Sequence, residues 1–553
     1  MLRRLRQHRA PELPSIFEHI RAHVRSEAAG LAEGGEELPD EAVFSEGGIQ
    51  FAPGALEGAF VRYAGSHDDE AAVERLHSTL VVLAKRPGAR TREHARELFR
   101  EGDVRVRIDP LTSRLAAFPP TSPGTLYDEL REIFLRSGHR DEVKYAMALM
   151  STYRRPEDAD LFRVIGRHEE FTLYAAVALS NVVDDPAHEW SELLQHVSGW
   201  GRTELSELIL REPQPEAVRE ELVRNGLGIG NALTLAQECR LHELLARPDI
   251  DDELLSRGRE IIDTLVWSWD SPFVLTDYEQ AGEASEHLVR HLSARAPDLD
   301  DFVSVYELRR FLTDDSFRFD YETGEDTYAK AGLDEERLSR VVALCSTFVE
   351  RDVWLQRADE AMASENEDDR RRGMEVAGRL GVDLHQYLID QLTNDPGDSG
   401  LWYRFVAGAD EPRLREAVDI AITHWDLSEI SRGPALDHFG GPSGPLGSVD
   451  FILQELPRFP GVGAALIGAS LRSPVIRHRW FALSALSRWE EKPSDLMQLV
   501  SDLARDDPDE GLRRDARVVL AGRAIPDPEE SDDDSDGDAE DGAGGKHSDQ
   551  APL

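Results

Sequence analysis

The sequence predicts an all-α protein in which similar helix pairs stack as an α-solenoid, followed by a disordered acidic C-terminal tail. Three observations support this fold class. Helix start signals and apolar residues at helical spacing recur along the 553 residues. A short helical pattern returns at intervals of 30 to 34 residues, a period typical of helical repeat proteins. The alternation of apolar and polar residues that is typical of strands is scarce.

Residues 1–118 are predicted to form an N-terminal, mostly helical segment. The segment opens with the basic stretch MLRRLRQHRA, and because no apolar run follows it, we do not expect a secretory signal. The best candidate for a strand is DVRVRID (103–109), which is short and isolated. The stretch AAFPPTSPGT (116–125) predicts a linker or long turn before the repeats.

Residues 119–395 are predicted to be helical repeats. Asp251 and Asp334 each stand before an amphipathic run, where an aspartate caps a helix. The pattern Ala-x-Ala-Leu occurs at 146–149 and again at 176–179. Small residues on one helical face allow the backbones of neighbouring helices to approach closely. The break TNDPGDSG (393–400) separates these repeats from the next ones.

Residues 396–525 carry the clearest internal repetition. SPVIRHRWFALSALSRW (473–489) matches DPDEGLRRDARVVLAGR (507–523) at positions 34 apart. The matched pairs are Pro474 and Pro508, Arg479 and Arg513, Ala482 and Ala516, and Leu486 and Leu520. Apolar residues lie on more than one side of the 473–489 helix, so we expect it to be sandwiched between neighbours.

Two resemblances to known families follow from these stretches. The pattern Pro-x4-Arg-x2-Ala-x2-[Ala/Val]-Leu, present at 474–486 and 508–520, resembles the second helix of a HEAT repeat. This resemblance implies a solenoid whose extended faces bind partners. HVSGWGRTELSELIL (196–210) and IQFAPGALEGAF (49–60) are similar to segments of bacterial proteins labelled limonene hydroxylase. That label implies a hydroxylase, but the sequence contains no recognisable site for iron, haem or flavin.

The tail, residues 526–553, holds 11 acidic residues against one lysine. Low hydrophobicity with dense charge predicts disorder. The remaining chain is also acidic, since the total net charge is −44 and only five residues are lysines. Such a surface repels phosphate backbones, so nucleic-acid binding is not expected. The composition is typical of proteins from a salt-rich cytoplasm, and a high-GC genome, which favours arginine codons, is the alternative interpretation.

Salt adaptation predicts that the fold loosens when the ionic strength falls. At 1 M salt the Debye length is about 3 Å, so repulsion between surface carboxylates is screened. We therefore expect the melting temperature to rise between low and molar salt. A melting temperature that stays constant over this range contradicts the interpretation.

The two cysteines, Cys239 and Cys345, cannot supply a disulfide framework, which predicts a reducing, cytoplasmic location. Each lies on an apolar helical stripe, so we expect both to be buried core residues. No stretch approaches the ~20 apolar residues of a membrane span, and no membrane association is predicted.

Motifs for catalysis, cofactors or metals are not recognisable. The glycines of NGLGIGNA (225–232) follow a charged amphipathic segment, so we interpret Gly226 as a helix C-cap and Asn231 as the next N-cap. The histidine pairs His19/His23 and His287/His291 are interpreted as helix-surface residues, because zinc needs three or four ligands. We predict no catalytic, cofactor-binding or metal-binding residues.

The function predicted from the sequence is a non-catalytic helical-repeat scaffold for protein–protein interaction. Tryptophan and arginine are enriched at binding hot spots, and residues that the repeat pattern does not require are candidates for partner contacts. The candidates are Trp200, Arg202, Trp267, Trp269, Arg477 and His478. The acidic surface favours a basic or mixed protein partner, and the oligomeric state is left open. An enzyme on the same scaffold, either a hydroxylase or a lyase or glycosylase, is the rival hypothesis.

Overall fold

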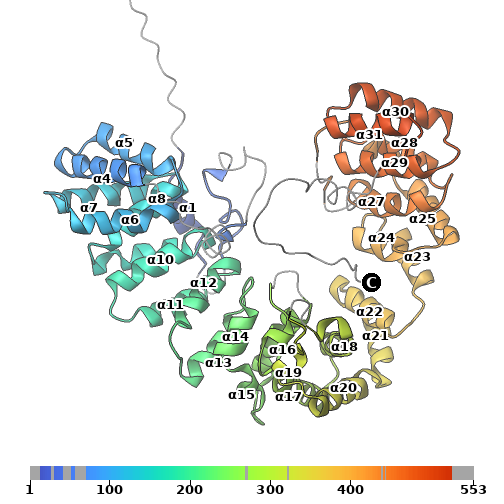
Figure 1. The fold of residues 1–553 in the computed structure, drawn as a ribbon, viewed down its shortest axis with the longest axis horizontal. Helices are drawn as coiled ribbons and strands as arrows, with labels where there is room; N and C mark the ends of the chain where they lie inside the picture. The colour runs from blue at the N-terminus through green and yellow to red at the C-terminus, as the bar shows by residue number, and fades with distance from the viewer. Residues whose placement is uncertain are drawn as a thin grey trace, which may run out of the picture. The chain divides into compact units, whose positions relative to one another are not determined.

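The computed structural model describes residues 13–25, 30–41, 52–55, 70–267, 272–319, 323–437, 440–441 and 444–525. Within these ranges all regular structure is helical, and β-type pairing is limited to isolated bridges (Figure 1). The prediction of an all-α protein is therefore confirmed. The acidic tail and Trp269 lie outside the described residues.

The chain divides into two compact units, residues 1–376 and 377–553. The finer division predicted at residues 118 and 395 stays a prediction. In the first unit the α-helices and the 3₁₀ helices (η) are α1 (Ile16–His23), α4 (Glu70–Lys85), α5 (Ala89–Arg100), α6 (Val104–Ala117), α7 (Pro123–Arg136), α8 (Arg140–Ser151), η2 (Pro156–Asp158), α9 (Ala159–Ile165), α10 (Glu169–Val182), α11 (Pro186–Leu194), α12 (Gly199–Ile209), α13 (Glu216–Asn225), α14 (Ala232–Glu238), α15 (Leu241–Leu245), α16 (Asp252–Trp267), η3 (Leu275–Asp277), α17 (Ala281–Ala294), α18 (Leu299–Thr313), η4 (Asp315–Phe317), α19 (Thr327–Lys330), α20 (Glu335–Val349) and α21 (Val353–Met362).

Helix α22 (Glu367–Arg379) runs across the division between the units. The second unit contains α23 (His385–Asn394), α24 (Ser399–Val406), α25 (Glu411–His424), α26 (Leu427–Ile430), α27 (Pro445–Glu455), η5 (Leu456–Arg458), α28 (Ala464–Ser470), α29 (Ile476–Arg488), α30 (Ser494–Asp506) and α31 (Glu510–Leu520).

In the first unit, longer helices pack side by side in chain order, with α7 against α8, α8 against α10, and α10 against α12. Helix α10 lies between two neighbours, and its alanines explain how. Ala175, Ala176 and Ala178 are all buried, so small side chains cover more than one of its faces. This close packing brings the N-terminal ends of α8 and α10 together.

In the second unit the 34-residue repetition of the sequence is also a repetition of bonds. The guanidinium of Arg479 donates to the carbonyls of Ser473 and Pro474 at 2.7 and 2.9 Å. The guanidinium of Arg513 donates to the carbonyls of Asp507 and Pro508, 34 residues later, at 2.5 and 3.3 Å. The two matched arginines thus brace the turns that enter α29 and α31 in the same way.

Arg479 and Asp507 also join the two matched segments. The carboxylate of Asp507 lies 2.8 Å from Nε of Arg479, and both side chains are fully buried. Trp489, at the end of the same helix, is buried as well and donates its indole N–H to the carbonyl of Leu456. The expectation that the 473–489 helix is sandwiched between neighbours is confirmed by its contacts with α27, α28 and α31.

The strand prediction for residues 103–109 is wrong, because these residues begin helix α6. The carboxylate of Asp103 accepts a hydrogen bond from the backbone N–H of Arg105 at 2.9 Å and caps the helix. Val104 and Leu111 are seven residues apart, so they share one helical face, and both are buried. A short alternating run cannot distinguish the two structures, and here the cap and the tertiary packing decide for the helix.

Two further predictions are confirmed. Cys239 and Cys345 are free and buried, and burial raises the pKa of each thiol to about 12. Gly226 occupies the C-cap of α13 and Asn231 precedes α14, as the turn interpretation requires. Within the described part of the chain, no helix is both long and apolar enough to cross a membrane.

Candidate functional site

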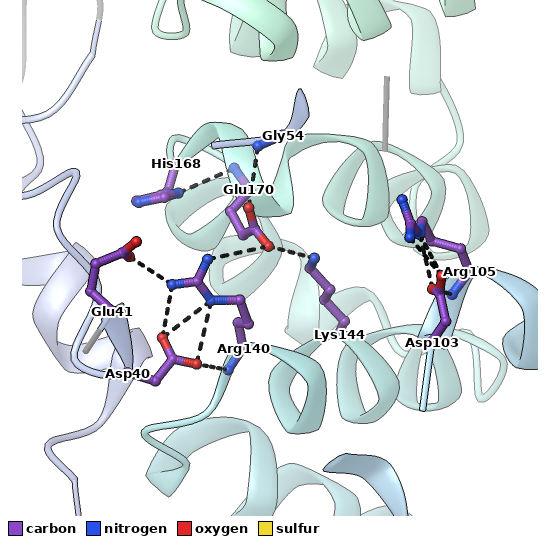
Figure 2. Close-up of polar contacts among 9 residues, drawn as sticks. All are labelled: Asp40, Glu41, Gly54, Asp103, Arg105, Arg140, Lys144, His168 and Glu170. Carbon is purple, nitrogen blue, oxygen red and sulfur yellow. Dashed lines mark hydrogen bonds and ion pairs between the residues drawn. The ribbon is translucent and has the colours of Figure 1, made fainter. Parts of the chain in front are cut away.

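The first turns of α8 and α10 carry a group of buried charged residues that we call the buried ionic cluster (Figure 2). Its members are Asp40, Arg140, Lys144, His168 and Glu170, and all five are less than a tenth exposed. Charged side chains are rarely buried unless they are paired. The cluster is therefore the most unusual polar arrangement in the described chain, and each member must have a partner.

Arg140 is held by a carboxylate from far away in the sequence. Asp40, 100 residues earlier, accepts from the backbone N–H of Arg140 at 2.8 Å and from its guanidinium at 3.1 and 3.2 Å. Glu41 accepts from the same guanidinium at 2.7 Å. Because a backbone donor of the first turn and the planar guanidinium meet one carboxylate, Asp40 caps α8 in place of a local residue.

Lys144 and Glu170 form the second pair of the cluster. Nζ of Lys144 lies 2.7 Å from Oε1 of Glu170, and Oε2 of Glu170 accepts from the backbone N–H of Gly54 at 3.2 Å. Burial on its own raises the pKa of Glu170, but the charges of Lys144 and Arg140 outweigh it and hold the pKa below its usual value. Glu170 is therefore a carboxylate at neutral pH.

The neighbouring Asp141 behaves in the opposite way. Burial raises its pKa to about 6, and the negative charges of Glu170 and Asp40 act in the same direction, although Lys144 opposes them. Around the two cations there are thus more carboxylates than the cations can balance. Figure 2 also shows Asp103 and Arg105, which pair with each other at the start of α6.

His168 caps α10 as a neutral imidazole. Its Nδ1 accepts from the backbone N–H of Glu170 at 3.2 Å, and its Nε2 lies 3.2 Å from the carbonyl of Glu36. A backbone N–H can only donate and a carbonyl can only accept, so the proton must be on Nε2. Burial lowers the pKa of His168 to about 4, which agrees with this neutral state.

Replacing His168 with asparagine is expected to weaken the loss of stability in acid. The folded-state pKa is lowered from 6.5 to about 4, so the stability that His168 contributes is present above pH 6.5 and is lost as the pH falls toward 4. The window of about 2.5 units corresponds to about 3 kcal/mol. Asparagine can cap the helix but does not titrate.

The measurement is urea unfolding of the wild type and His168→Asn at pH 7.5 and pH 4. We expect the difference in unfolding free energy between the two proteins to change by about 3 kcal/mol in favour of the variant at pH 4. Asp141 has a raised pKa, so its contribution grows as the pH falls from 6, but it is the same in both proteins and cancels. An unchanged difference contradicts the assignment of His168.

Trp200 and Arg202, two of the predicted partner contacts, lie next to the buried ionic cluster. The backbone N–H of Trp200 donates to Glu169 at 3.0 Å. Gly54, with φ of +76°, packs so closely that an added Cβ would stand 3.1 Å from Cβ of Trp200 and 2.9 Å from the carbonyl of Glu169. Arg202 is half-buried, and burial lowers its pKa. Parts of the 49–60 and 196–210 stretches therefore meet here.

Arg477 and His478 lie in the second unit and contact the same carboxylate. Nε2 of His478 is 2.8 Å from Asp450 of α27, and Arg477 forms an ion pair with Asp450 as well. Nδ1 of His478 lies 2.9 Å from Oγ of Ser473. Ser, His and Asp are the groups of a nucleophilic triad, but His478 and Ser473 are fully buried, and the Ser473 hydroxyl accepts from the backbone N–H of Val475. We interpret the group as a structural link between α27 and α29.

The remaining predicted partner contact, Trp267, is the last residue of α16 and is 49% exposed. The predicted residues thus fall in three places, with Trp200 and Arg202 in one, Trp267 in another, and Arg477 and His478 in a third. Among the residues that the structure describes, no three His, Cys, Asp or Glu side chains are grouped to hold a metal ion. No protein-family model and no curated protein matches the chain.

Proposed function

We propose that the protein is a cytoplasmic, non-catalytic scaffold of HEAT-like helical repeats that binds a basic protein partner. The observation that carries the proposal is a group of exposed apolar side chains around η3 and η4. Its members are Trp267, Phe273, Val274, Phe317 and Phe319. Large apolar side chains that gather on a surface mark interaction sites, whereas single ones need no explanation.

The elements that carry these residues adjoin one another. The 3₁₀ helix η3 packs against both α16 and α19, and η4 packs against α18. The hydroxyl of Thr327 in α19 donates to the carbonyl of Phe317 at 2.6 Å, which fixes η4 to α19. We call this region, from Trp267 to Phe319, the aromatic surface.

The charges near the aromatic surface favour a basic partner. Asp277, Asp315 and Glu325 are exposed on the same elements. The nearby cations Arg318 and Lys330 are already paired with Asp326 and Glu325. Complementary charge steers association and rejects partners of the wrong sign, so the local balance agrees with the net charge of −44.

The repeat part of the proposal is supported by the bonding of Arg479 and Arg513. Matched residues 34 positions apart make the same contacts, and the buried Arg479–Asp507 pair joins one segment to the next. Repeat proteins are stabilised through such contacts between neighbouring units and use their extended faces for binding. The disordered acidic tail remains part of the proposal.

Substitution of Trp267 by alanine is expected to weaken partner binding at least tenfold, because aromatic anchors carry much of the binding energy. Leu355→Ala is the matched control, since Leu355 is a large apolar residue of α21 with 47% exposure. The assay is affinity capture from the native cytoplasm at native salt, with the melting temperature of each variant measured in parallel. A Trp267 variant that melts early, or that captures the same partner as Leu355→Ala, contradicts the proposal.

The rival hypothesis, an enzyme on the same scaffold, is tested by elemental analysis and an absorbance spectrum of protein purified in high salt. Stoichiometric iron, haem or flavin in the purified protein would overturn the proposal of a non-catalytic scaffold.

A further inference from the structure

Two N-terminal stretches, residues 30–41 and 52–55, lie across the starts of α8, α10 and α12. We call them together the N-terminal clasp. Their polar attachments to the buried ionic cluster are Asp40 and Glu41 on Arg140, the carbonyl of Glu36 on His168, and the N–H of Gly54 on Glu170. All of these bonds join residues that are far apart in the sequence.

The N-terminal clasp also covers the turn that carries Trp200. The backbone N–H of Gly30 donates to the carbonyl of His196 at 3.0 Å. At the other end, Gly54 lies against Trp200 and Glu169 with no room for a Cβ. The turn at residues 196–200 is therefore contacted by both stretches of the clasp.

The attachment of the N-terminal clasp is mostly polar. Of its leucines and alanines only Leu31 and Leu38 are buried. Segments with few buried apolar contacts open locally at a lower free energy than the core. The clasp can therefore open while α8 and α10 remain folded.

The charge of the N-terminal clasp opposes its closure at low salt. Residues 30–41 hold five acidic residues and no basic residue. They face the carboxylates of Asp141, Glu169 and Glu170, whereas the only cations of the cluster are Arg140 and Lys144, and His168 is neutral. Salt screens exposed repulsion more than it weakens the buried Asp40–Arg140 pair.

We propose that the N-terminal clasp is a salt-dependent, autoinhibitory cover, and that its opening exposes the Trp200 turn to the basic partner. The link to the partner rests on the proposed function. A basic partner would also pair with the exposed Glu33 and Glu37 of the clasp, which favours the open state. The clasp and the partner therefore compete for the same surface.

The test is hydrogen exchange of residues 196–204 in the full-length protein, with Gly54→Val against Gly34→Val. Both glycines have a positive φ, +76° and +80°, so both variants carry the same backbone strain. Only the Cβ at position 54 meets other atoms, whereas nothing lies within 4 Å of a Cβ at position 34. We expect at least tenfold faster exchange at 196–204 in Gly54→Val, and wild-type exchange rates in Gly34→Val.

A salt series on the wild type tests the same inference without a substitution, in case Gly54→Val does not fold. Lowering the salt from 2 M to 0.1 M should raise exchange at 196–204 before it raises exchange within α10. Equal exchange in the two glycine variants, or a wild-type rate at 196–204 that changes only together with α10, overturns the inference.

The coupling to the partner has a separate measurement. Gly54→Val should bind the captured partner several-fold more tightly than Gly34→Val, because the cover is already displaced. Equal affinity would overturn the autoinhibitory role even if exchange at 196–204 is fast. Failure of the Trp267 test would instead overturn the proposed function and leave the exchange result in place.

Discussion

Replacing Arg140 with leucine is expected to lower the free energy of unfolding by about 3–5 kcal/mol, because the substitution leaves Asp40 buried without a counter-ion. Asp40 is fully buried and loses both its guanidinium hydrogen bonds and its ion pair. The measurement is urea unfolding at neutral pH and high salt. A loss below about 1 kcal/mol contradicts the role given to this pair.

Two controls make the effect of Arg140 specific. Arg136→Leu removes an arginine of α7 whose side chain is 77% exposed, and we expect a change within about 0.5 kcal/mol. In the double variant Asp40→Leu with Arg140→Leu, no charge of the pair is left buried. This variant should recover a large part of the stability, because replacing a whole buried pair is far less harmful than breaking it.

Replacing Arg479 with leucine is expected to have a similar effect in the second unit, also about 3–5 kcal/mol. Arg479 is fully buried, pairs with the buried Asp507, and donates to three carbonyls, those of Ser473, Pro474 and Ala435. Removing it leaves a buried carboxylate and three carbonyls without this donor.

The matched variant Arg513→Leu is the internal control for Arg479. Arg513 makes the same two bonds to the carbonyls that precede its helix, but it is only half-buried. We expect a loss of about 1 kcal/mol for Arg513→Leu. Equal losses at the two positions, measured by urea unfolding, would contradict the importance given to the Arg479–Asp507 pair.

The parts of the fold that could be predicted from the sequence depend on local patterns. Helical spacing and capping residues act over a few positions, which is why the all-α class and the burial of Cys239 and Cys345 were predicted correctly. The matched arginines 34 residues apart were found for the same reason. The strand prediction at 103–109 failed because the pattern was short and tertiary packing decided the outcome.

The buried ionic cluster was not predicted because its contacts join distant residues. Asp40 and Arg140 are 100 residues apart, and Gly54 and Glu170 are 116 residues apart. One signal in the sequence pointed to it. Lys144 is one of five lysines in the chain and stands inside the apolar run VKYAMALM, and a lysine in such a run needs a buried partner.

His478 shows the limit of reasoning from a repeat pattern. The pattern does not require a histidine at this position, which made it a candidate for partner contacts. In the structure its two ring nitrogens face Asp450 and Ser473, and the side chain is fully buried. The contact with Asp450 crosses from one helix to another, so no spacing within the 473–489 helix could have indicated it.

The central claim, that the protein acts by binding a basic partner through its aromatic surface, is tested most directly by a titration. The captured partner is purified and titrated into the wild type and Trp267→Ala at native salt, with heat or fluorescence anisotropy as the signal. We predict saturable binding at a fixed stoichiometry for the wild type and at least tenfold weaker binding for the variant. Identical binding curves for the two proteins, or no saturable binding of any captured protein to the wild type, would contradict the claim.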